Sequence, residues 1–287
     1  MSRDDDRERS GRPERSALLL AGGRSTRFGE SEKALAELGG APLLCHTAAA
    51  LAPVVDELVV NCREDQRDAF AAALAPLDER LPVRFAVDPV DDEGPVAGLL
   101  TGLRVARGQY VAVAGCDQPF LRTATVADLF AHATGEAGAG TPAGAAPLAE
   151  DRPQPLGAVY HRDRAREAAV HTMAAGSRAL RDVLARVDPL AVPVAPGVVR
   201  DIDTQDELGA VSGEEMSKDA GNREIMEVII ENTAPTANRP ASDTAVLPDG
   251  GEDPRSESRR GAERTDGGPS SDARRTTSDL RSDGGED

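Results

Sequence analysis

The chain is poor in aromatic residues, lysine and cysteine. Its 287 residues include no tryptophan, and all five phenylalanines and both tyrosines lie between Phe28 and Tyr160. The three cysteines form no C-x-x-C pair, so neither a disulfide framework nor a zinc cluster is indicated. No run of about 18 apolar residues occurs, which excludes a transmembrane helix, and the charged N-terminus lacks the apolar segment of a secretory signal. We therefore expect a soluble, cytoplasmic protein.

The charge is strongly negative. Asp and Glu number 50 against 33 Lys and Arg, which gives a net charge of −17, and Lys33 and Lys218 are the only lysines. A surface of this sign repels phosphate backbones, and the sequence has no basic stripe, so we expect no nucleic-acid binding. The acid-rich, lysine-poor composition fits either a salt-rich cytoplasm or a GC-rich genome, and neither determines the chemistry.

Composition divides the chain into three parts. Residues 212–287 carry 18 acidic and 10 basic residues, with no aromatic residue, among Ser, Gly, Pro and Thr. Such a segment buries too little apolar surface to offset its ordering entropy, so we predict that it is mostly disordered, as are residues 1–15. One exception is EIMEVII (224–230), which is compatible with a short helix or strand. Residues 16–211 are expected to form one folded domain.

Strand-like and helix-like patterns alternate in residues 16–211. Apolar runs bounded by Gly, Asp or Pro predict strands, and the stretches between them predict helices. This alternation indicates an α/β fold in which a mostly parallel sheet lies between two helical layers. The predicted strands are 16–21, 57–61, 83–87 and 110–115, with weaker candidates at 155–160 and 190–194. The predicted helices are 42–51, 65–74, 95–106, 123–133, 162–175 and 177–187.

Ligands of such sheets bind beyond the carboxyl ends of the strands, and a glycine-rich segment follows the first strand. In LAGGRSTRFGESEKAL (20–35), Gly22 and Gly23 allow close approach of the backbone to an anion, and successive N–H groups can form a nest for phosphate. Arg24, Arg27 and Lys33 add cations. The segment is neither a Walker loop nor GxGxxG. A glycine pair alone could be a turn and Lys33 a solvated lysine, but the combined spacing favours phosphate binding.

Polar side chains follow three further strands. Asp117 in GCDQPFL can hold Mg²⁺ while substrate phosphates complete its shell; the alternative is an Asx-turn. Asn61 can read a base or ribose with its amide, and Asp88 can accept hydrogen bonds from the amino and imino groups of a base. Turn chemistry is the alternative for both. Residues 91–93 are expected to form a solvated acidic loop.

These segments together resemble one known family. LAGGRSTRFGESEKAL, the VVN strand end, VDPVDDEGPVAGLLTGL and CDQPFL are similar to the molybdenum cofactor guanylyltransferases, which belong to nucleotidyltransferases with a glycosyltransferase-A-like, Rossmann-like fold. The resemblance extends from about Ala17 to Leu208. It implies Mg²⁺-assisted transfer of GMP from GTP to the phosphate of Mo-molybdopterin, with release of pyrophosphate. It also implies transient contacts with molybdenum-insertion or molybdoenzyme partners.

The resemblance assigns roles to individual residues. Lys33 and Asp117 match the catalytic pair, and Asp117 matches the ligand of Mg²⁺. Because the attacking phosphate is already an anion, positioning and charge neutralisation are expected to dominate, and no strong general base is needed. The residues expected to bind GTP are Leu20, Ala21, Gly22, Gly23, Arg27, Lys33, Asn61, Asp88 and Asp117.

The chain also departs from the family pattern. Asp203-Thr204-Gln205 stands where Asn-Thr-Pro is common, so Asp203 either contacts metal or caps the helix that follows. Residues 135–149 form a looser stretch than expected over the half that binds the pterin. Other phosphorylated acceptors from deazaflavin-cofactor, cobinamide or sugar-phosphate chemistry, and CTP as donor, are alternatives with the same fold. A non-catalytic nucleotide-binding subunit is the alternative from a different class.

Overall fold

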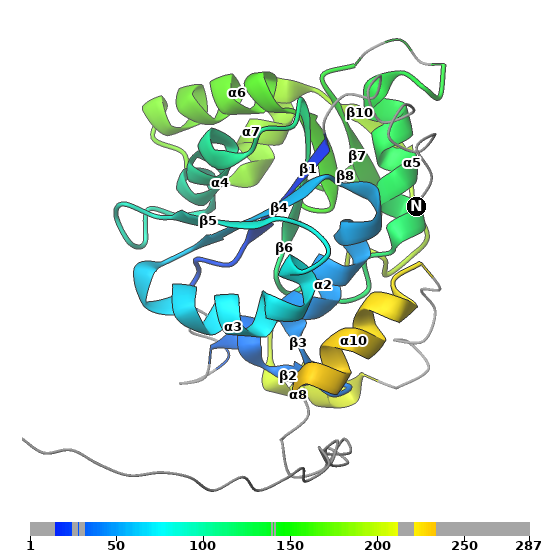
Figure 1. Ribbon diagram of the computed structural model, residues 1–287. Coiled ribbons are helices and arrows are strands. Elements are labelled where there is room, and N and C mark those ends of the chain that lie inside the picture. Colours follow the sequence, from blue (N-terminus) through cyan, green and yellow to red (C-terminus); the bar gives the residue numbers. More distant parts are fainter. Residues whose placement is uncertain are drawn as a thin grey trace, which may run out of the picture. The chain divides into compact units, whose positions relative to one another are not determined.

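The structure is a computed structural model that describes residues 15–24, 28, 32–138, 140, 142–211 and 221–233. An eight-stranded mixed sheet lies between two helical layers (Figure 1), which is the predicted α/β fold. Its strands are β1 (Arg15–Leu20), β4 (Glu57–Cys62), β5 (Val83–Val87), β6 (Tyr110–Gly115), β7 (Gly144–Ala149), β8 (Arg152–Pro153), β9 (Ala158–His161) and β10 (Leu190–Pro193). They are ordered β10-β7-β9-β6-β1-β4-β5, and β8 pairs with β7.

Four parallel strands bring the predicted site residues to one edge. Strand β1 pairs with β4 on one side and with β6 on the other, so that Leu20 lies opposite both Asn61 and Gly115. Strand β5 continues the sheet beside β4, with Val87 opposite Cys62. Strands β1, β4 and β6 are buried along most of their length, which explains why their apolar runs were recognisable in the sequence. The segments that follow these strands therefore meet at one edge of the sheet.

The other half of the sheet contains antiparallel pairs and two strands that were not predicted, β7 and the short β8. Strand β9 is antiparallel to both β6 and β7, and β10 is parallel to β7. Strand β7 lies in the stretch interpreted as loose. It is made of small residues, and a Cβ at Gly144 would lie 2.4 Å from the carbonyl oxygen of Val159. The close approach of two backbones thus replaces the bulky apolar side chains that usually mark a strand.

Two hydrophobic clusters join the helices to the sheet. Helices α2 (Leu43–Leu51), α3 (Arg67–Asp78) and α5 (Thr123–Thr134) contribute to the cluster on one face. Helices α4 (Pro95–Val105), α6 (Arg162–Ala174) and α7 (Leu180–Val187) contribute to the cluster on the other. The helices agree with the sequence prediction except at their ends. The short elements are η1 (Lys33–Leu35), η2 (Ala52–Val54), η3 (Glu64–Gln66), the hairpin of β2 (Glu37–Leu38) and β3 (Ala41–Pro42), and α8 (Gln205–Ala210).

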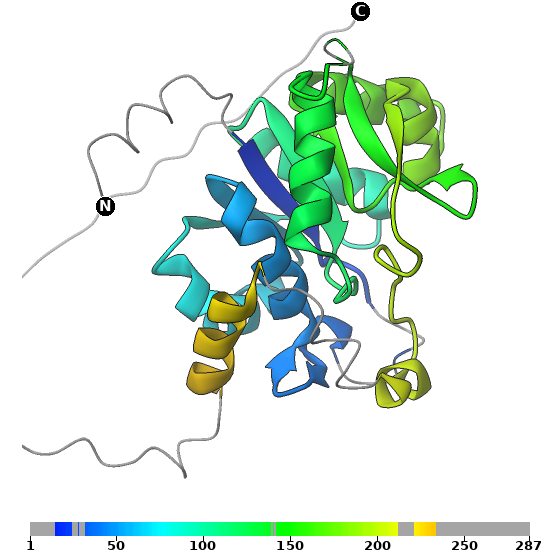
Figure 2. The ribbon, with the colours of Figure 1, turned by 90° about the vertical axis from the view of Figure 1, so that its right-hand side faces the viewer.

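One more helix lies within the acidic C-terminal segment. The EIMEVII sequence forms part of α10 (Arg223–Thr233), so of its two alternatives the helix is the one observed. Ile229 is completely buried in the cluster that contains α2 and α3, and Figures 1 and 2 both place α10 beside these helices. In the described part of the chain, no helix combines the length and apolar character needed to cross a membrane.

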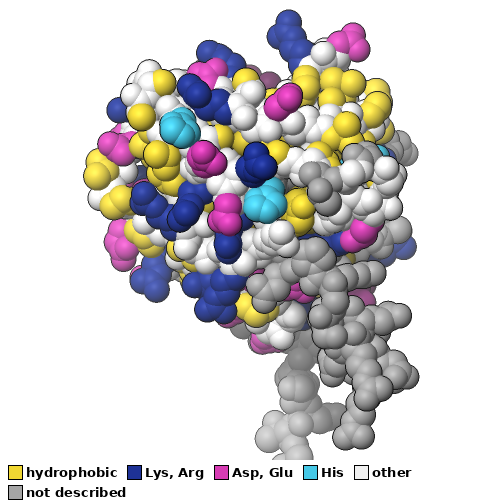
Figure 3. Space-filling view, turned by 90° about the horizontal axis from the view of Figure 1, so that it is seen from above, with side chains coloured by type: hydrophobic (Ala, Val, Ile, Leu, Met, Phe, Trp, Pro, Cys, Tyr) yellow, Lys and Arg dark blue, Asp and Glu magenta, His cyan; other side chains and the backbone are white. Residues whose placement is uncertain are grey.

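The surface carries mixed charge where it can be seen from above. Figure 3 shows Lys and Arg side chains interspersed with Asp, Glu, His and hydrophobic side chains on that face.

Candidate active site

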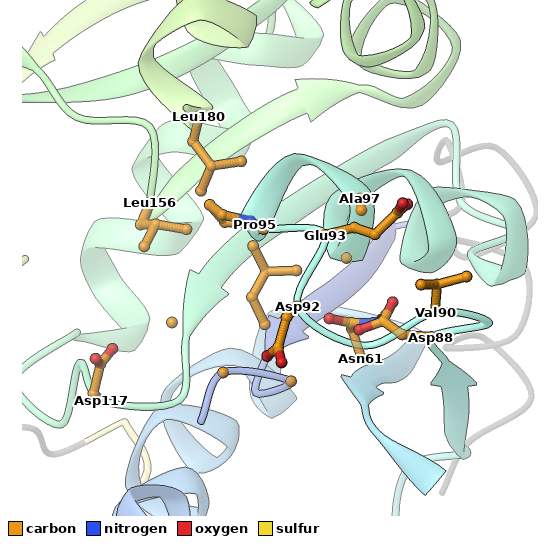
Figure 4. A pocket seen from close by; sticks show the side chains of 16 residues that line it. Asn61, Asp88, Val90, Asp92, Glu93, Pro95, Ala97, Asp117, Leu156 and Leu180 are labelled. Atoms are coloured by element: carbon orange, nitrogen blue, oxygen red, sulfur yellow. Dashed lines mark hydrogen bonds between the residues drawn. The ribbon is translucent and has the colours of Figure 1, made fainter. Parts of the chain in front are cut away.

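A cavity of about 360 Å³ opens where the four parallel strands end. Figure 4 shows Asp117 at one end of it and the pair Asn61 and Asp88 at the other. Leu156 and Leu180 contribute an apolar wall. The predicted site residues that line it are Leu20, Gly22, Gly23, Asn61, Asp88 and Asp117. Strand ends far apart in sequence thus border one cavity, whereas the predicted residues Ala21 and Lys33 do not line it.

The glycine-rich segment begins as an extension of the sheet. The N–H of Ala21 donates to the carbonyl oxygen of Asn61, and that of Cys116 donates to Leu20, so the chain stays fixed for one residue beyond β1. A Cβ at Gly22 would lie 2.8 Å from Oδ2 of Asp88, whereas one at Gly23 would meet none of the described residues within 4 Å. Gly22 is therefore required by the close approach of Asp88, while Gly23 leaves open space. The predicted Arg27 lies outside the described residues.

Asn61 holds Asp88 in place. Its Nδ2 donates to the carbonyl oxygen of Ala86 at 3.0 Å and to Oδ1 of Asp88 at 2.8 Å, so both amide hydrogens have acceptors within the protein. The amide nitrogen is thus not free to read a base or ribose as the sequence suggested. Burial raises the pKa of Asp88, and the hydrogen bond from Asn61 opposes that rise. Asn61 acts on the cavity by orienting this carboxylate.

Lys33 joins two carboxylates at the other end of the cavity. Its Nζ donates to Oδ2 of Asp117 at 2.6 Å and to Oδ1 of Asp203 at 2.9 Å. Lys33 is only 7% exposed. Burial alone would lower its pKa, but the hydrogen bonds and negative charges of the two carboxylates outweigh burial and raise it. The lysine is therefore a permanent cation at this position.

The structure excludes the cap as the role of Asp203. The cap of α8 is Thr204, whose Oγ1 accepts a hydrogen bond from the N–H of Glu207 at 3.1 Å. Asp203 precedes the cap, and its carboxylate contacts Lys33. The N–H of Ile202 donates to the carbonyl oxygen of Asp117, which ties this segment to the turn after β6. Asp203 therefore belongs with the Lys33–Asp117 pair.

Gln118 and Asp201 also contribute to this end of the site and were missed in the sequence. Gln118 accepts a hydrogen bond from the N–H of Gly115 and donates to the carbonyl oxygen of Val199, which fixes the turn that carries Asp117. Asp201 as a whole residue is exposed to solvent. Desolvation of its carboxylate nevertheless raises its pKa to about 6, together with the negative charge of Asp117. Asp201 follows no predicted strand, so the rule that selected the other site residues did not reach it. Gln118 stands directly after Asp117 beyond the predicted strand 110–115, but no role was assigned to its amide.

The acidic loop after Asp88 is largely exposed, as expected, and it also borders the cavity. Asp92 and Glu93 line the cavity. Nε of Arg24 lies 2.6 Å from Oδ2 of Asp92, and its Nη2 lies 3.5 Å from Oδ2 of Asp91. Arg24, expected to serve phosphate, thus bridges the glycine-rich segment and this loop. The loop follows a strand end directly, and that position was the signal available in the sequence.

The residues around Lys33 fit a hard divalent cation only in part. Among the described residues, no three His, Cys, Asp or Glu side chains are grouped to hold a metal ion. Oxygens of Asp117 and Asp203 both lie within hydrogen-bond distance of the same nitrogen. Mg²⁺ is commonly held by one or two carboxylates, with substrate phosphates and water supplying the other ligands. The site thus fits Mg²⁺ bound together with a nucleotide.

Comparisons with known proteins agree with this arrangement. The family model for the MobA-like NTP transferase domain matches residues 17–190. A probable molybdenum cofactor guanylyltransferase from Haloferax mediterranei is 41% identical over 205 residues, which cover 69% of this chain and 93% of the relative. One from Natronomonas pharaonis is 37% identical over 179 residues, covering 62% and 84%.

Solved structures share the fold. The 4-diphosphocytidyl-2C-methyl-D-erythritol synthase from Anaerococcus prevotii is similar with a TM-score of 0.53 and 14% sequence identity, over 68% of this chain and 93% of that one. At this identity the likeness concerns the fold alone.

Proposed function

This chain belongs to the molybdenum cofactor guanylyltransferases of the MobA-like NTP transferase family, and we propose that it transfers GMP from GTP to the phosphate of Mo-molybdopterin. The products are the guanine dinucleotide form of the cofactor and pyrophosphate. The observation that carries this proposal is the contact of Lys33 with Asp117 and Asp203. Of these three residues Asp117 lines the cavity, together with Gly22 and Asp88.

Asp88 favours guanine over the other bases. Guanine presents an imino N–H beside an amino group, and a carboxylate held in a fixed direction can accept from both. Cytosine and adenine have a ring nitrogen acceptor beside their amino group, and that lone pair would face the negative carboxylate. Asn61 supplies the fixed direction through its hydrogen bond to Asp88. We therefore assign the base to this end of the cavity.

The triphosphate is assigned to the glycine-rich segment and Lys33. The acceptor's phosphate oxygen attacks the α-phosphorus of GTP, a new P–O bond forms, and the bond to the β-phosphate oxygen breaks so that pyrophosphate leaves. Lys33, kept protonated by its carboxylate partners, stabilises the charge that accumulates on the leaving group. Asp117 and Asp203 would hold Mg²⁺, which when bound supplies further charge neutralisation. No histidine lines the described cavity, in keeping with a nucleophile that is already an anion.

The acceptor is assigned from the relatives rather than from contacts. Both haloarchaeal relatives are described as probable molybdenum cofactor guanylyltransferases. We assign the proposed acceptor, Mo-molybdopterin, to the apolar wall of Leu156 and Leu180, on the side of the cavity away from Asp88. The transient contacts with molybdenum-insertion or molybdoenzyme proteins remain part of this proposal.

A nucleotide-transfer assay tests the proposal. Purified protein is incubated with molybdopterin, Mg²⁺, high KCl and each NTP in turn, and pyrophosphate release is measured. We expect acceptor-dependent release with GTP alone, lost in Lys33→Ala and Asp117→Ala. Release with CTP instead would keep the fold and mechanism but overturn the assignment of the base. GTP binding without release would point to another acceptor or to a binding protein without catalysis.

A further inference from the structure

A buried arginine lies behind the glycine-rich segment. Arg63 directly follows β4, is 8% exposed and does not line the cavity. Its Nη1 donates to the carbonyl oxygens of Gly22 at 3.1 Å and Gly23 at 2.9 Å. Its remaining nitrogens contact Asp65 and Glu32, so its charge is compensated within the protein. One guanidinium thus fixes two consecutive peptide carbonyls of the segment assigned to phosphate.

Gln66 extends the same arrangement by one residue. Its Nε2 donates to the carbonyl oxygen of Ala21 at 3.2 Å and to Oε2 of Glu32 at 2.8 Å, while its Oε1 accepts from the N–H of Arg63. The carbonyls of residues 21, 22 and 23 are therefore all held by side chains from the segment after β4. Glu32 directly precedes Lys33, so the same contacts also anchor the start of η1, which carries the lysine.

Holding these carbonyls determines where the N–H groups point. In a planar trans peptide the carbonyl of one residue and the N–H of the next point in opposite directions. The carbonyls of Gly22 and Gly23 point toward Arg63, away from the cavity that both glycines line. The N–H groups of Gly23 and Arg24 consequently point away from the arginine. Among the described residues a Cβ at Gly23 would meet nothing within 4 Å, so this glycine borders open space in the cavity.

We propose that Arg63, assisted by Gln66 and Glu32, is a positioning residue that orients the backbone N–H groups of the glycine-rich segment toward the triphosphate. This proposal rests on the proposed function, because it needs a nucleotide in the cavity. Donors oriented before binding need no reorganisation when the anion arrives, which strengthens their interaction with it. The base end of the cavity has separate supports, the contacts of Asn61 with Ala86 and Asp88. Losing Arg63 should therefore weaken binding of the phosphates and leave binding of the base intact.

The test compares GTP with guanosine. Dissociation constants for both are measured by competition against a fluorescent GTP analogue for wild type, Arg63→Met, Arg63→Lys and Gln66→Leu. For Arg63→Met we expect GTP to bind about 10- to 100-fold more weakly, equivalent to about 1.4–3 kcal/mol, with guanosine unchanged. Arg63→Lys should be intermediate, because an ammonium lacks the guanidinium's planar fork. Arg67→Met, at an exposed position of α3, is the matched control and should bind both ligands as wild type does.

Each outcome separates this proposal from the proposed function. An equal loss for GTP and guanosine, or no loss for either, would overturn the positioning role of Arg63. If Arg63→Met does not fold, Gln66→Leu decides by the same comparison. It removes the contacts of Gln66 with the Ala21 carbonyl, the Glu32 carboxylate and the N–H of Arg63, and it keeps the guanidinium that holds the carbonyls of Gly22 and Gly23. A wild-type protein that binds CTP in place of GTP would overturn the guanine assignment. CTP and cytidine would then replace GTP and guanosine in the comparison that tests Arg63. Wild type that binds no nucleotide would overturn both.

Discussion

Nζ of Lys33 lies 2.6 Å from Oδ2 of Asp117, although 84 positions separate the two residues in the chain. The two groups that the proposed reaction needs most therefore neutralise one another before any ligand is present. Asp203 shares the same ammonium group from a third segment. A nucleotide with its metal ion would find the cation and the carboxylates already assembled, which keeps the reorganisation required for catalysis small.

Removing either member of the pair should abolish most of the transfer activity. We expect Lys33→Met and Asp117→Asn each to lower kcat by about 10²- to 10³-fold, the usual effect of losing one preorganised group that stabilises transition-state charge. Pyrophosphate release at saturating GTP is the measurement. Asp128→Asn, an exposed aspartate on α5, is the matched control. A Lys33→Met or Asp117→Asn enzyme with more than about a tenth of wild-type kcat would contradict the assignment.

Mg²⁺ should stabilise the Lys33→Met variant more than it stabilises the wild type. Without the lysine, Asp117 and Asp203 face each other with no cation between them, and like charges at short distance destabilise the fold. A divalent ion bound there raises Tm by mass action. Thermal unfolding with and without MgCl₂ measures the difference. The same Mg²⁺-induced shift in wild type, Lys33→Met and Lys33→Met/Asp203→Asn would show that the ion does not bind at these carboxylates.

Two glycines of α4 should affect different properties when each is replaced by alanine, Gly98 the binding of GTP and Gly102 the stability of the fold. A Cβ at Gly98 would lie 2.3 Å from Oδ1 of Asn61, so Gly98→Ala must displace the side chain that orients Asp88. A Cβ at Gly102 would lie 2.3 Å from Cδ1 of Leu18, in the core. We expect Gly98→Ala to weaken GTP binding about tenfold or more, and Gly102→Ala to cost about 1–3 kcal/mol of stability with GTP affinity unchanged.

Calorimetry for binding and urea unfolding for stability separate these two effects. Alanine is favoured over glycine in a helix by about 1 kcal/mol, which partly offsets the strain in both variants. If Gly98→Ala binds GTP as wild type does, Asn61 is not needed to orient the base-binding carboxylate.

The sequence predicted those features that depend on runs of apolar side chains. Strands β1, β4 and β6 are buried on both faces, so Leu and Val mark them continuously, and the polar residues just beyond them were found by position alone. Strand β7 was missed because alanine, glycine and proline fill a place where two backbones approach closely. The contacts of Arg63 were missed for a different reason. Its partners are backbone carbonyls, and the direction of a carbonyl leaves no trace in the residue types.

The end of the folded domain was also hard to place from composition. Ile229 of α10 is completely buried although it lies in an acidic, aromatic-free segment. We expect Ile229→Ala to lower the free energy of unfolding by about 2–3 kcal/mol. This is the lower part of the range for truncating a buried isoleucine to alanine, because α10 lies at the margin of the core. Urea denaturation is the measurement, and Ile230→Ala, at a position 36% exposed, should cost less. Equal effects of the two would mean that α10 is not held through Ile229.

His46 should make the protein less stable as the pH falls. Burial lowers its pKa below the ordinary 6.5, although its hydrogen bonds with backbone oxygens, including a 2.7 Å contact of Nε2 with Leu38, oppose that shift. Below about pH 6.5 the unfolded chain binds a proton at this site that the folded protein does not take up, so the free energy of unfolding falls with decreasing pH. Above about pH 7.5 the histidine is neutral in both states, and its contribution to stability is constant.

His46→Gln keeps a donor for Leu38 and cannot titrate in this range. Urea unfolding from about pH 8 to about pH 5 should therefore show a smaller loss of stability in His46→Gln than in wild type. The exposed His171→Gln on α6 controls for the loss of a histidine, and identical pH dependence of wild type and His46→Gln would rule out this role for His46.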